Sequence, residues 1–323
     1  MTYDDCELIK FEQIGKNYAQ QAAVADFSLN VKRGEIFVLV GASGSGKTTI
    51  IRMINGLVMP TTGSIYFDGR KIETYNLRTL RFQIGYVLQQ IALFPNMSVA
   101  QNVALIPSMK RTDKSKINRL VDQLLTDVNL EPHVYRNRMP DELSGGEKQR
   151  VGILRAFAAQ PKVVLMDEPF SALDPISRTQ LQKLVLTIHR KLRSTIIFVT
   201  HDMDEALKLG DRIGVMRSGS LLQVGTPQEI VQHPNDPFVR QLFEKSMSHD
   251  VYAVYLNKLD VLGYLQPMPD QYKGPELAQE QTVREAFTAF VSADQLAIRT
   301  KDHHLQLLTR EKLYQFVSDY RNH

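Results

Sequence analysis

Cysteine is almost absent from this sequence of 323 residues, and Cys6 is its single instance. One thiol excludes an internal disulfide and favours a reducing compartment. The first ten residues carry acidic side chains where a secretory signal needs positive charge, so we expect no signal peptide. Runs of five or more Lys or Arg residues are also missing, although the formal net charge is +4. Their absence argues against nucleic acid as a partner.

Long hydrophobic runs are missing as well. The apolar stretches at residues 36–40, 163–166 and 196–199 are far shorter than the roughly 20 residues of a membrane-spanning helix. They are rich in Val and Ile, which predicts buried strands of a mostly parallel sheet. Any role at a membrane would therefore depend on a partner subunit.

The composition is that of an ordinary globular protein, with 43% hydrophobic and 23% charged residues. The length predicts one large domain and a smaller one. Helix and strand patterns alternate through the first part, which predicts an α/β domain over residues 1–243 with a helical subdomain at about 90–160. We expect residues 250–323 to form a small C-terminal α+β domain.

A glycine-rich loop follows the first of the apolar strands. The sequence Gly-Ala-Ser-Gly-Ser-Gly-Lys-Thr at residues 41–48 fits the phosphate-loop pattern. Its glycines let backbone N–H groups converge on a phosphate chain, and a helix pattern follows. Lys47 would meet the β- and γ-phosphates of ATP, and Thr48 would hold Mg²⁺ through its hydroxyl. The alternative is an incidental Gly-rich turn, which the flanking strand and helix patterns disfavour.

A pair of carboxylates ends the apolar strand at residues 163–166. Ligand sites of open α/β sheets lie at the carboxyl ends of the strands. We therefore expect Asp167 to contact the Mg²⁺ shell and Glu168 to orient and deprotonate an attacking water. Taken alone, the pair could equally be a helix cap before Pro169, but the phosphate loop favours the catalytic interpretation.

The segment Leu-Ser-Gly-Gly-Glu at residues 143–147 predicts a second anion site, because it presents backbone N–H groups at a helix N-terminus. The alternative is a Ser N-cap with a Gly-rich turn. The segment closely resembles the signature of the ATP-binding-cassette (ABC) transporters, with Glu147 where Gln is commonest. In that family this loop completes the nucleotide site of the opposite subunit. The resemblance therefore implies a homodimer held together by ATP.

Other landmarks of the ABC family follow in order between residues 7 and 243. Tyr18 matches the aromatic residue that stacks on adenine, and residues 171–174 match a loop that contacts the opposite subunit. His201 matches the histidine that hydrogen-bonds the γ-phosphate. Gln89 matches a glutamine that senses Mg²⁺ and water, but Gln90 follows it directly and both stay candidates.

The resemblance assigns these residues to four groups. The catalytic residues are Glu168, His201 and Gln89; the ATP-binding residues are Tyr18, Gly41, Ala42, Ser43, Gly44, Ser45, Gly46, Lys47, Thr48 and Thr49; the Mg²⁺ residues are Thr48, Gln89 and Asp167; the residues that act across the dimer are Ser144, Gly145, Gly146, Glu147 and Asp174.

Residues 84–97 are similar to the ATPases of importers for quaternary amines such as glycine betaine, carnitine and choline. This similarity implies that ATP hydrolysis powers import through separate permease subunits, with a solute-binding protein in the same system. It also implies a peripheral position on the cytoplasmic face of the cell membrane. Another small polar solute, such as an amino acid or taurine, is the alternative, and a non-transport ABC protein is less favoured.

The C-terminal part differs from such relatives, which end in two CBS modules. Residues 282–287 and 305–313 resemble one degenerate CBS-like module. A ligand-binding role of its own for this part is compatible with the transport hypothesis.

Overall fold

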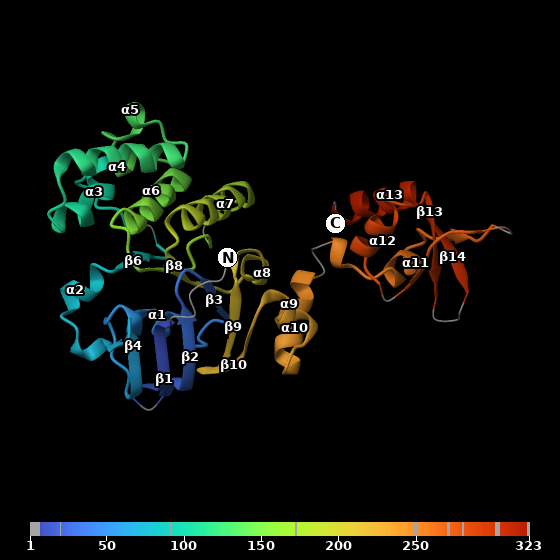
Figure 1. The fold of residues 1–323 in the computed structure, drawn as a ribbon, viewed down its shortest axis with the longest axis horizontal. Helices are drawn as coiled ribbons and strands as arrows, with labels where there is room; N and C mark the ends of the chain where they lie inside the picture. Colours follow the sequence, from blue (N-terminus) through green and yellow to red (C-terminus); the bar gives the residue numbers. More distant parts are fainter. Residues whose placement is uncertain are drawn as a thin grey trace. The chain divides into compact units, whose positions relative to one another are not determined.

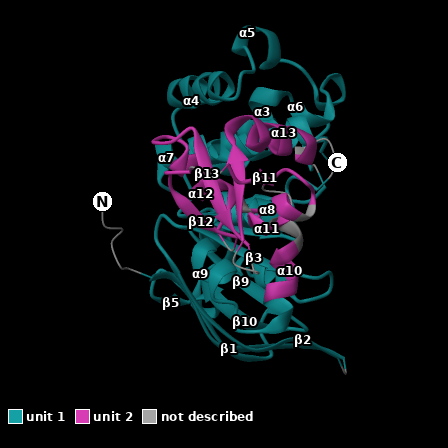
Figure 2. Cartoon of the chain, turned by 90° about the vertical axis from the view of Figure 1, so that its right-hand side faces the viewer, with its two compact units in different colours: residues 1–239 teal, residues 240–323 magenta. Residues whose placement is uncertain are grey.

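The computed structural model describes residues 7–19, 21–90, 92–171, 173–247, 251–269, 272–279, 281–300 and 304–321. Cys6 lies outside these ranges, and so does Ala172 of the segment 171–174. The chain divides into two compact units, residues 1–239 and 240–323 (Figure 2). Within the described ranges, no helix has the length and apolar character needed to cross a membrane.

The central sheet of the first unit has the described strands in the order β10-β9-β3-β8-β7-β6. Neighbouring strands are parallel, except that β10 is antiparallel to β9. Every residue of β3, β7 and β8 is buried, because both faces of the sheet are covered. The predicted, mostly parallel sheet is thereby confirmed, and its parallel strands bring their carboxyl ends to one edge. The strands are β3 Ile36–Gly41, β6 Ile84–Val87, β7 Val163–Asp167, β8 Thr195–Thr200, β9 Arg212–Arg217 and β10 Ser220–Gly225.

A second sheet, with the order β2-β1-β4-β5, is antiparallel throughout. It was not predicted as a separate sheet. Register shifts between β1 and β2 interrupt the simple alternation of buried and exposed residues from which a strand is recognised. Its strands are β1 Glu7–Tyr18, β2 Gln21–Lys32, β4 Thr62–Phe67 and β5 Arg70–Lys71.

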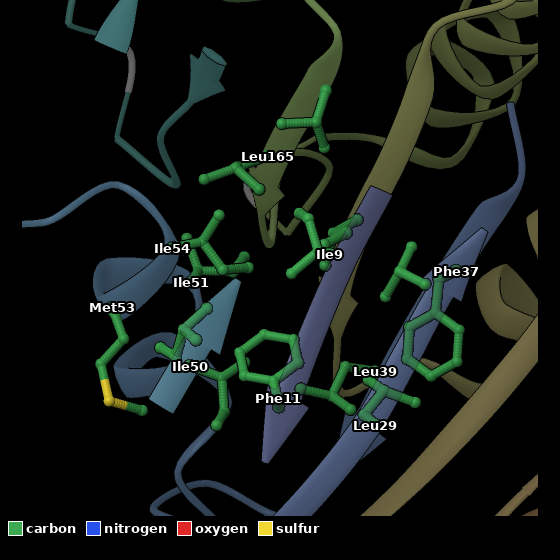
Figure 3. Close-up of a cluster of buried hydrophobic side chains, with 14 of the residues drawn as sticks. Ile9, Phe11, Leu29, Phe37, Leu39, Ile50, Ile51, Met53, Ile54 and Leu165 are labelled. Carbon is green, nitrogen blue, oxygen red and sulfur yellow. The ribbon is translucent and has the colours of Figure 1, made fainter. Parts of the chain in front are cut away.

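Helix α1 (Lys47–Ile54) contacts strands of both sheets. Its apolar side chains pack with those of β1, β2 and β3 in one buried cluster, in which Figure 3 labels Phe11, Leu39 and Ile50. Burying an isoleucine or phenylalanine side chain contributes about 1.5–3 kcal/mol. The cluster therefore fixes α1, and with it the loop that precedes α1, against both sheets.

Further helices of the first unit complete the layers. Helices α3, α4, α5 and α6 contact one another and gather at one end of the unit, away from β1, β2 and β4 (Figure 1). Capping boxes at Ser98 and Ser144 begin α3 and α6. These helices are α2 Leu77–Arg81, α3 Val99–Met109, α4 Lys114–Asp127, α5 Pro132–Tyr135, α6 Gly145–Phe157, α7 Pro175–Leu192, α8 Met203–Leu209 and α9 Pro227–Gln232. Helix α10 (Pro237–Met247) crosses the boundary between the units.

The second unit is an α+β structure, as predicted. Its sheet has the order β11-β14-β13-β12, in which β12 and β13 are parallel and joined by a helix. Leu256, Leu296 and Phe316 belong to its own buried core. Its elements are α11 Asn257–Val261, β11 Gln266–Pro267, β12 Glu276–Ala278, α12 Val283–Ala289, β13 Gln295–Arg299, β14 Leu305–Thr309 and α13 Arg310–Arg321.

Candidate functional site

The phosphate loop joins β3 to α1, and two of its positions require glycine. A Cβ atom on Gly41 would lie 2.2 Å from the carbonyl oxygen of Met216. Gly46 has a φ of +100°, and a Cβ there would lie 2.5 Å from the carbonyl oxygen of Ala23. A larger residue at either position would push the backbone apart, so the close packing of this loop explains the glycine pattern.

Lys47 is the first residue of α1, and its ammonium group turns back into the loop. The residue is only 5% exposed. Its Nζ donates to the carbonyl oxygens of Gly41 at 2.7 Å and Ala42 at 3.0 Å. Burial lowers the pKa of Lys47, and the nearby carboxylates of Glu168 and Asp167 oppose that change. The loop thus holds a cation where the β- and γ-phosphates of a nucleotide are expected.

Thr48 and Asp167 bring together two oxygen atoms of the kind that bind Mg²⁺. The Thr48 hydroxyl donates to Oδ1 of Asp167 at 3.1 Å. Burial raises the pKa of the Asp167 carboxyl, while the hydrogen bond from Thr48 lowers it. In the described part of the chain, no cluster of three or more His, Cys, Asp or Glu could hold a metal ion. Mg²⁺ is usually held by one or two carboxylates together with substrate phosphates, so the donor set fits Mg²⁺ shared with a nucleotide.

Glu168 follows directly on β7 and receives side chains from two other segments. Its Oε2 lies 3.0 Å from Nδ1 of His201 and accepts a hydrogen bond from Nε2 of Gln89 at 3.4 Å. The backbone of Glu168 has a φ of +46°, which is uncommon for a residue other than glycine. Its N–H donates to the carbonyl of Val199 at 2.9 Å and so holds this conformation. Strain of this kind clusters at functional sites.

A cleft of about 470 Å³ opens over the phosphate loop and collects residues from distant parts of the sequence. Tyr18, at its edge, is 47% exposed, which leaves ring surface for stacking on a base. Gln89 lines the cleft beside Glu168, whereas Gln90 does not line it. The lining residues are Tyr18, Gln21, Ala22, Ala23, Ser43, Gly44, Ser45, Gly46, Lys47, Thr48, Thr49, Gln89 and Glu168.

The second predicted anion site begins α6. Ser144 is the N-cap of this helix: its Oγ accepts the N–H of Glu147 at 3.3 Å, and Oε2 of Glu147 accepts the N–H of Ser144 at 2.7 Å. Ser144 and Gly145 are exposed. Residues 144–147 are all described, and none of them lines the cleft over the phosphate loop. The N-terminus of α6 is therefore a second candidate anion site, which lies outside the cleft over the phosphate loop.

The loop between Glu168 and α7 ends in a carboxylate that caps the helix. Asp174 is the N-cap of α7, and its carboxylate accepts the N–H of Ser177 at 3.0 Å. Hydrogen bonds from Ser177 lower the pKa of Asp174. Earlier in the loop, the hydroxyl of Ser171 donates to the carbonyl of Glu168 at 3.0 Å. Each end of this loop is thus held by a local hydrogen bond.

Comparison with known proteins identifies the family. A family model described as ABC transporter matches residues 24–171. The glycine betaine uptake system ATP-binding protein YehX of Escherichia coli is 42% identical over 88% of this chain and 91% of its own length. The chain belongs to the ABC transporter family. As an ABC ATPase it binds nucleotide, and ATP hydrolysis is the general activity of the family.

Two further comparisons concern parts of this ABC ATPase. The glycine betaine/carnitine/choline transport ATP-binding protein OpuCA of Bacillus subtilis is 46% identical over 74% of this chain. The chain spans 63% of OpuCA, less than two thirds of its length. A solved dimeric structure, the ATP-binding cassette MJ0796 in a post-hydrolysis state with ADP and Pi, has a TM-score of 0.61 and 30% identity, over 68% of this chain and 98% of its own.

One buried contact in the ABC ATPase was missed from the sequence. Gln149 of α6 is 4% exposed, and its Nε2 donates to the carbonyl of Pro169 at 2.6 Å. The signature helix is thereby tied to the residue after Glu168. Gln149 lies four positions before the buried Ile153 and therefore on the same, buried face of the helix. A polar residue at such a position indicates a buried hydrogen bond, and this signal was available in the sequence.

Proposed function

We propose that two copies of this chain form composite ATP sites, each built from the cleft of one copy and the signature loop of the other. The observation that supports this arrangement is the separation of the two anion-binding loops. The phosphate loop lines the cleft, whereas Ser144 and its neighbours present an exposed helix N-terminus elsewhere. One chain does not need two γ-phosphate sites for a single nucleotide. The signature loop of each copy would therefore bind the nucleotide held in the cleft of the other copy. The dimeric relative of known structure supports the same assembly.

We assign the hydrolytic step to Glu168. Its carboxylate would take a proton from water while the water oxygen bonds to the γ-phosphorus. The bond from that phosphorus to the β–γ bridging oxygen breaks, and ADP and phosphate leave. Gln89 and His201, which both contact Oε2 of Glu168, would orient this carboxylate and the water.

The other site residues would hold the nucleotide in place. Lys47 and the loop N–H groups would bind its phosphates, and Tyr18 would stack on its base. Thr48 and Asp167 would hold Mg²⁺, which supplies charge neutralisation at the phosphates. Gln89, which hydrogen-bonds Glu168 and lines the same cleft as Thr48, would join that shell.

Mixed dimers test the head-to-tail arrangement. We expect a Ser144→Arg chain paired with a Lys47→Ala chain to trap one ATP per dimer, in a Glu168→Gln background that prevents turnover. The phosphate loop of the Ser144→Arg chain is intact and would face the intact signature of its partner, whereas the other site would carry both defects. Trapped nucleotide per purified dimer is the measurement. The two parent homodimers are the controls, because every site in each of them carries one defect.

Failure of this test has a distinct form. If the signature served its own chain, each site of the mixed dimer would carry one defect and none would trap ATP. Mixed dimers without trapped nucleotide, alongside unmodified-loop dimers that trap two, would therefore refute the trans arrangement.

We further propose that this ATPase powers import of a quaternary amine through separate permease subunits, from a peripheral position on the cytoplasmic face of the membrane. The names of YehX and OpuCA, which specify glycine betaine or glycine betaine, carnitine and choline, support the solute class. A solute-binding protein is expected in the same system. The permease would contact the ATPase, and the solute would not.

Uptake measurements test the solute class. Deletion of the gene in its host is expected to abolish ATP-dependent uptake of labelled glycine betaine or choline, and the intact gene restores it. A Glu168→Gln gene should not restore uptake, because hydrolysis is blocked. Loss of taurine or amino-acid uptake, with quaternary-amine uptake unchanged, would contradict the proposed solute and leave the ATPase function standing.

A further inference from the structure

The signature loop contains a negative charge close to the place where a phosphate is expected. Glu147 is the third residue of α6, and its carboxylate belongs to the capping box of Ser144. An unconstrained carboxylate at a helix N-terminus would compete with a phosphate for the same N–H groups and repel it. The structure contains a specific restraint on this carboxylate.

That restraint is the hydroxyl of Tyr135, at the end of α5. Tyr135 Oη donates to Oε1 of Glu147 at 2.7 Å, and the N–H of Ser144 donates to Oε2 of the same carboxylate at 2.7 Å. Both oxygens are therefore occupied. The hydrogen bond from Tyr135 lowers the pKa of Glu147, so the group is an anion whose charge is taken up by its own neighbours.

Tyr135 is itself held in place. The guanidinium of Arg138 lies 4.4 Å from the centroid of its ring, and the charge of Arg138 also lowers the pKa of Glu147. The carbonyls of Arg136 and Arg138 accept the N–H groups of Ala100 and Val99 at 2.9 Å, which anchors this loop to the start of α3. The hydroxyl of Tyr135 thus comes from a fixed backbone.

The restraint leaves backbone N–H groups at the start of α6 for a phosphate. Oγ of Ser144 accepts the N–H of Glu147 at 3.3 Å, which uses a lone pair of the hydroxyl. The Ser144 hydroxyl also hydrogen-bonds to the Glu147 carboxylate and lowers the pKa of Glu147. The N–H groups of Gly145 and Gly146 are available to a phosphate, because the Glu147 carboxylate is turned back to Ser144 and Tyr135.

We propose that Tyr135 is a positioning residue for the signature loop: it holds the Glu147 carboxylate away from the phosphate that Ser144 and the following glycines bind. This inference rests on the proposed function, in which that phosphate belongs to the nucleotide of the second copy. It explains how this chain uses Glu at position 147, since the charge is matched by a hydroxyl donor and a nearby guanidinium.

The test is a double-mutant cycle between Tyr135→Phe and Glu147→Gln in full-length Glu168→Gln protein. The readout is the ATP concentration that gives half-maximal dimer by size-exclusion chromatography with Mg²⁺. Tyr135→Phe should raise this concentration by about tenfold, because it removes a hydrogen bond to a charged acceptor. The same change in the Glu147→Gln background, compared with its own parent, should raise it by less than about twofold, because no charge remains to restrain.

Two controls separate positioning from damage to the fold. Tyr135→Phe should bind a fluorescent ATP analogue with unchanged affinity as a monomer, because its own phosphate loop is untouched. Tyr75→Phe is the matched variant: the Tyr75 hydroxyl donates to the neutral carbonyl of Phe67 at 2.9 Å, away from the signature. This control should leave ATP-driven dimerisation unchanged.

Each alternative outcome overturns the inference. Normal ATP-driven dimerisation of Tyr135→Phe would show that Tyr135 does not position the signature loop. If Tyr135→Phe weakens dimerisation equally with Glu147 present and in the Glu147→Gln background, Tyr135 does not act through the Glu147 charge and has a structural role. If the Glu168→Gln parent itself does not dimerise with ATP, the proposed composite site fails, and the role of Tyr135 fails with it.

Discussion

Glu168→Gln should bind ATP and lose hydrolysis by about 10²–10⁴-fold. The amide is nearly isosteric with the carboxylate but cannot take a proton from water. Because Gln89 and His201 converge on one oxygen of this side chain, the change removes the proton acceptor while the surrounding contacts can largely persist. Steady-state phosphate release measures the loss. ATP should then hold two chains together, which size-exclusion chromatography with ATP and Mg²⁺ detects.

Glu205→Gln is the matched control for this change. Glu205 is a buried carboxylate next to the carboxyl end of β8. Its Oε2 accepts a hydrogen bond from Thr200 at 2.7 Å, but it does not line the cleft. An amide oxygen can accept the same bond, so its rate of hydrolysis should stay within about threefold of the parent. A Glu168→Gln protein that hydrolyses ATP at a near-normal rate would remove Glu168 from the catalytic role.

Lys47→Ala should fail earlier, at nucleotide binding, with a loss of affinity of about 100-fold or more. Lys47 provides a buried cation that its neighbours cannot replace, since the loop otherwise offers only N–H dipoles to a phosphate chain. Equilibrium titration with a fluorescent ATP analogue measures the affinity. A thermal unfolding curve shows whether the variant is folded, because Gly41 and Ala42 lose their partner as well.

Lys162→Ala provides the comparison for Lys47→Ala. The Lys162 ammonium forms a partly exposed ion pair with Asp68 and takes no part in the cleft. Its removal should leave the affinity for ATP unchanged, because exposed ion pairs contribute little and the phosphate loop is intact. Unchanged affinity and hydrolysis in Lys47→Ala would contradict the phosphate-loop assignment.

Several features could be predicted because they depend on short stretches of sequence. The glycines of the phosphate loop, the apolar strand before it and the carboxylates at the end of β7 are each fixed by neighbouring residues. The α/β fold and the family follow from them and are confirmed by the comparisons. The domain boundary, the CBS-like character of residues 250–323 and the roles of the site residues stay predictions.

Other features depend on the order of the strands. Gln89 and His201 are far from Glu168 in the sequence, and they meet it because β6, β7 and β8 are neighbours in the central sheet. The sequence left Gln89 and Gln90 as alternatives, since adjacent residues share the same local pattern. The position of Gln89 favours it for this role, because its side chain contacts Glu168 and lines the cleft.

The sequence by itself thus determined which chemical groups this protein has at its strand ends and helix starts, because caps, glycine turns and buried strands follow from local sterics and periodicity. Only the tertiary structure decided which of these groups meet. The left-handed backbone of Glu168 is held by a hydrogen bond to Val199 of the adjacent strand, and the Glu147 carboxylate is held by Tyr135 from another helix. Such contacts depend on packing between distant segments, which no local pattern encodes.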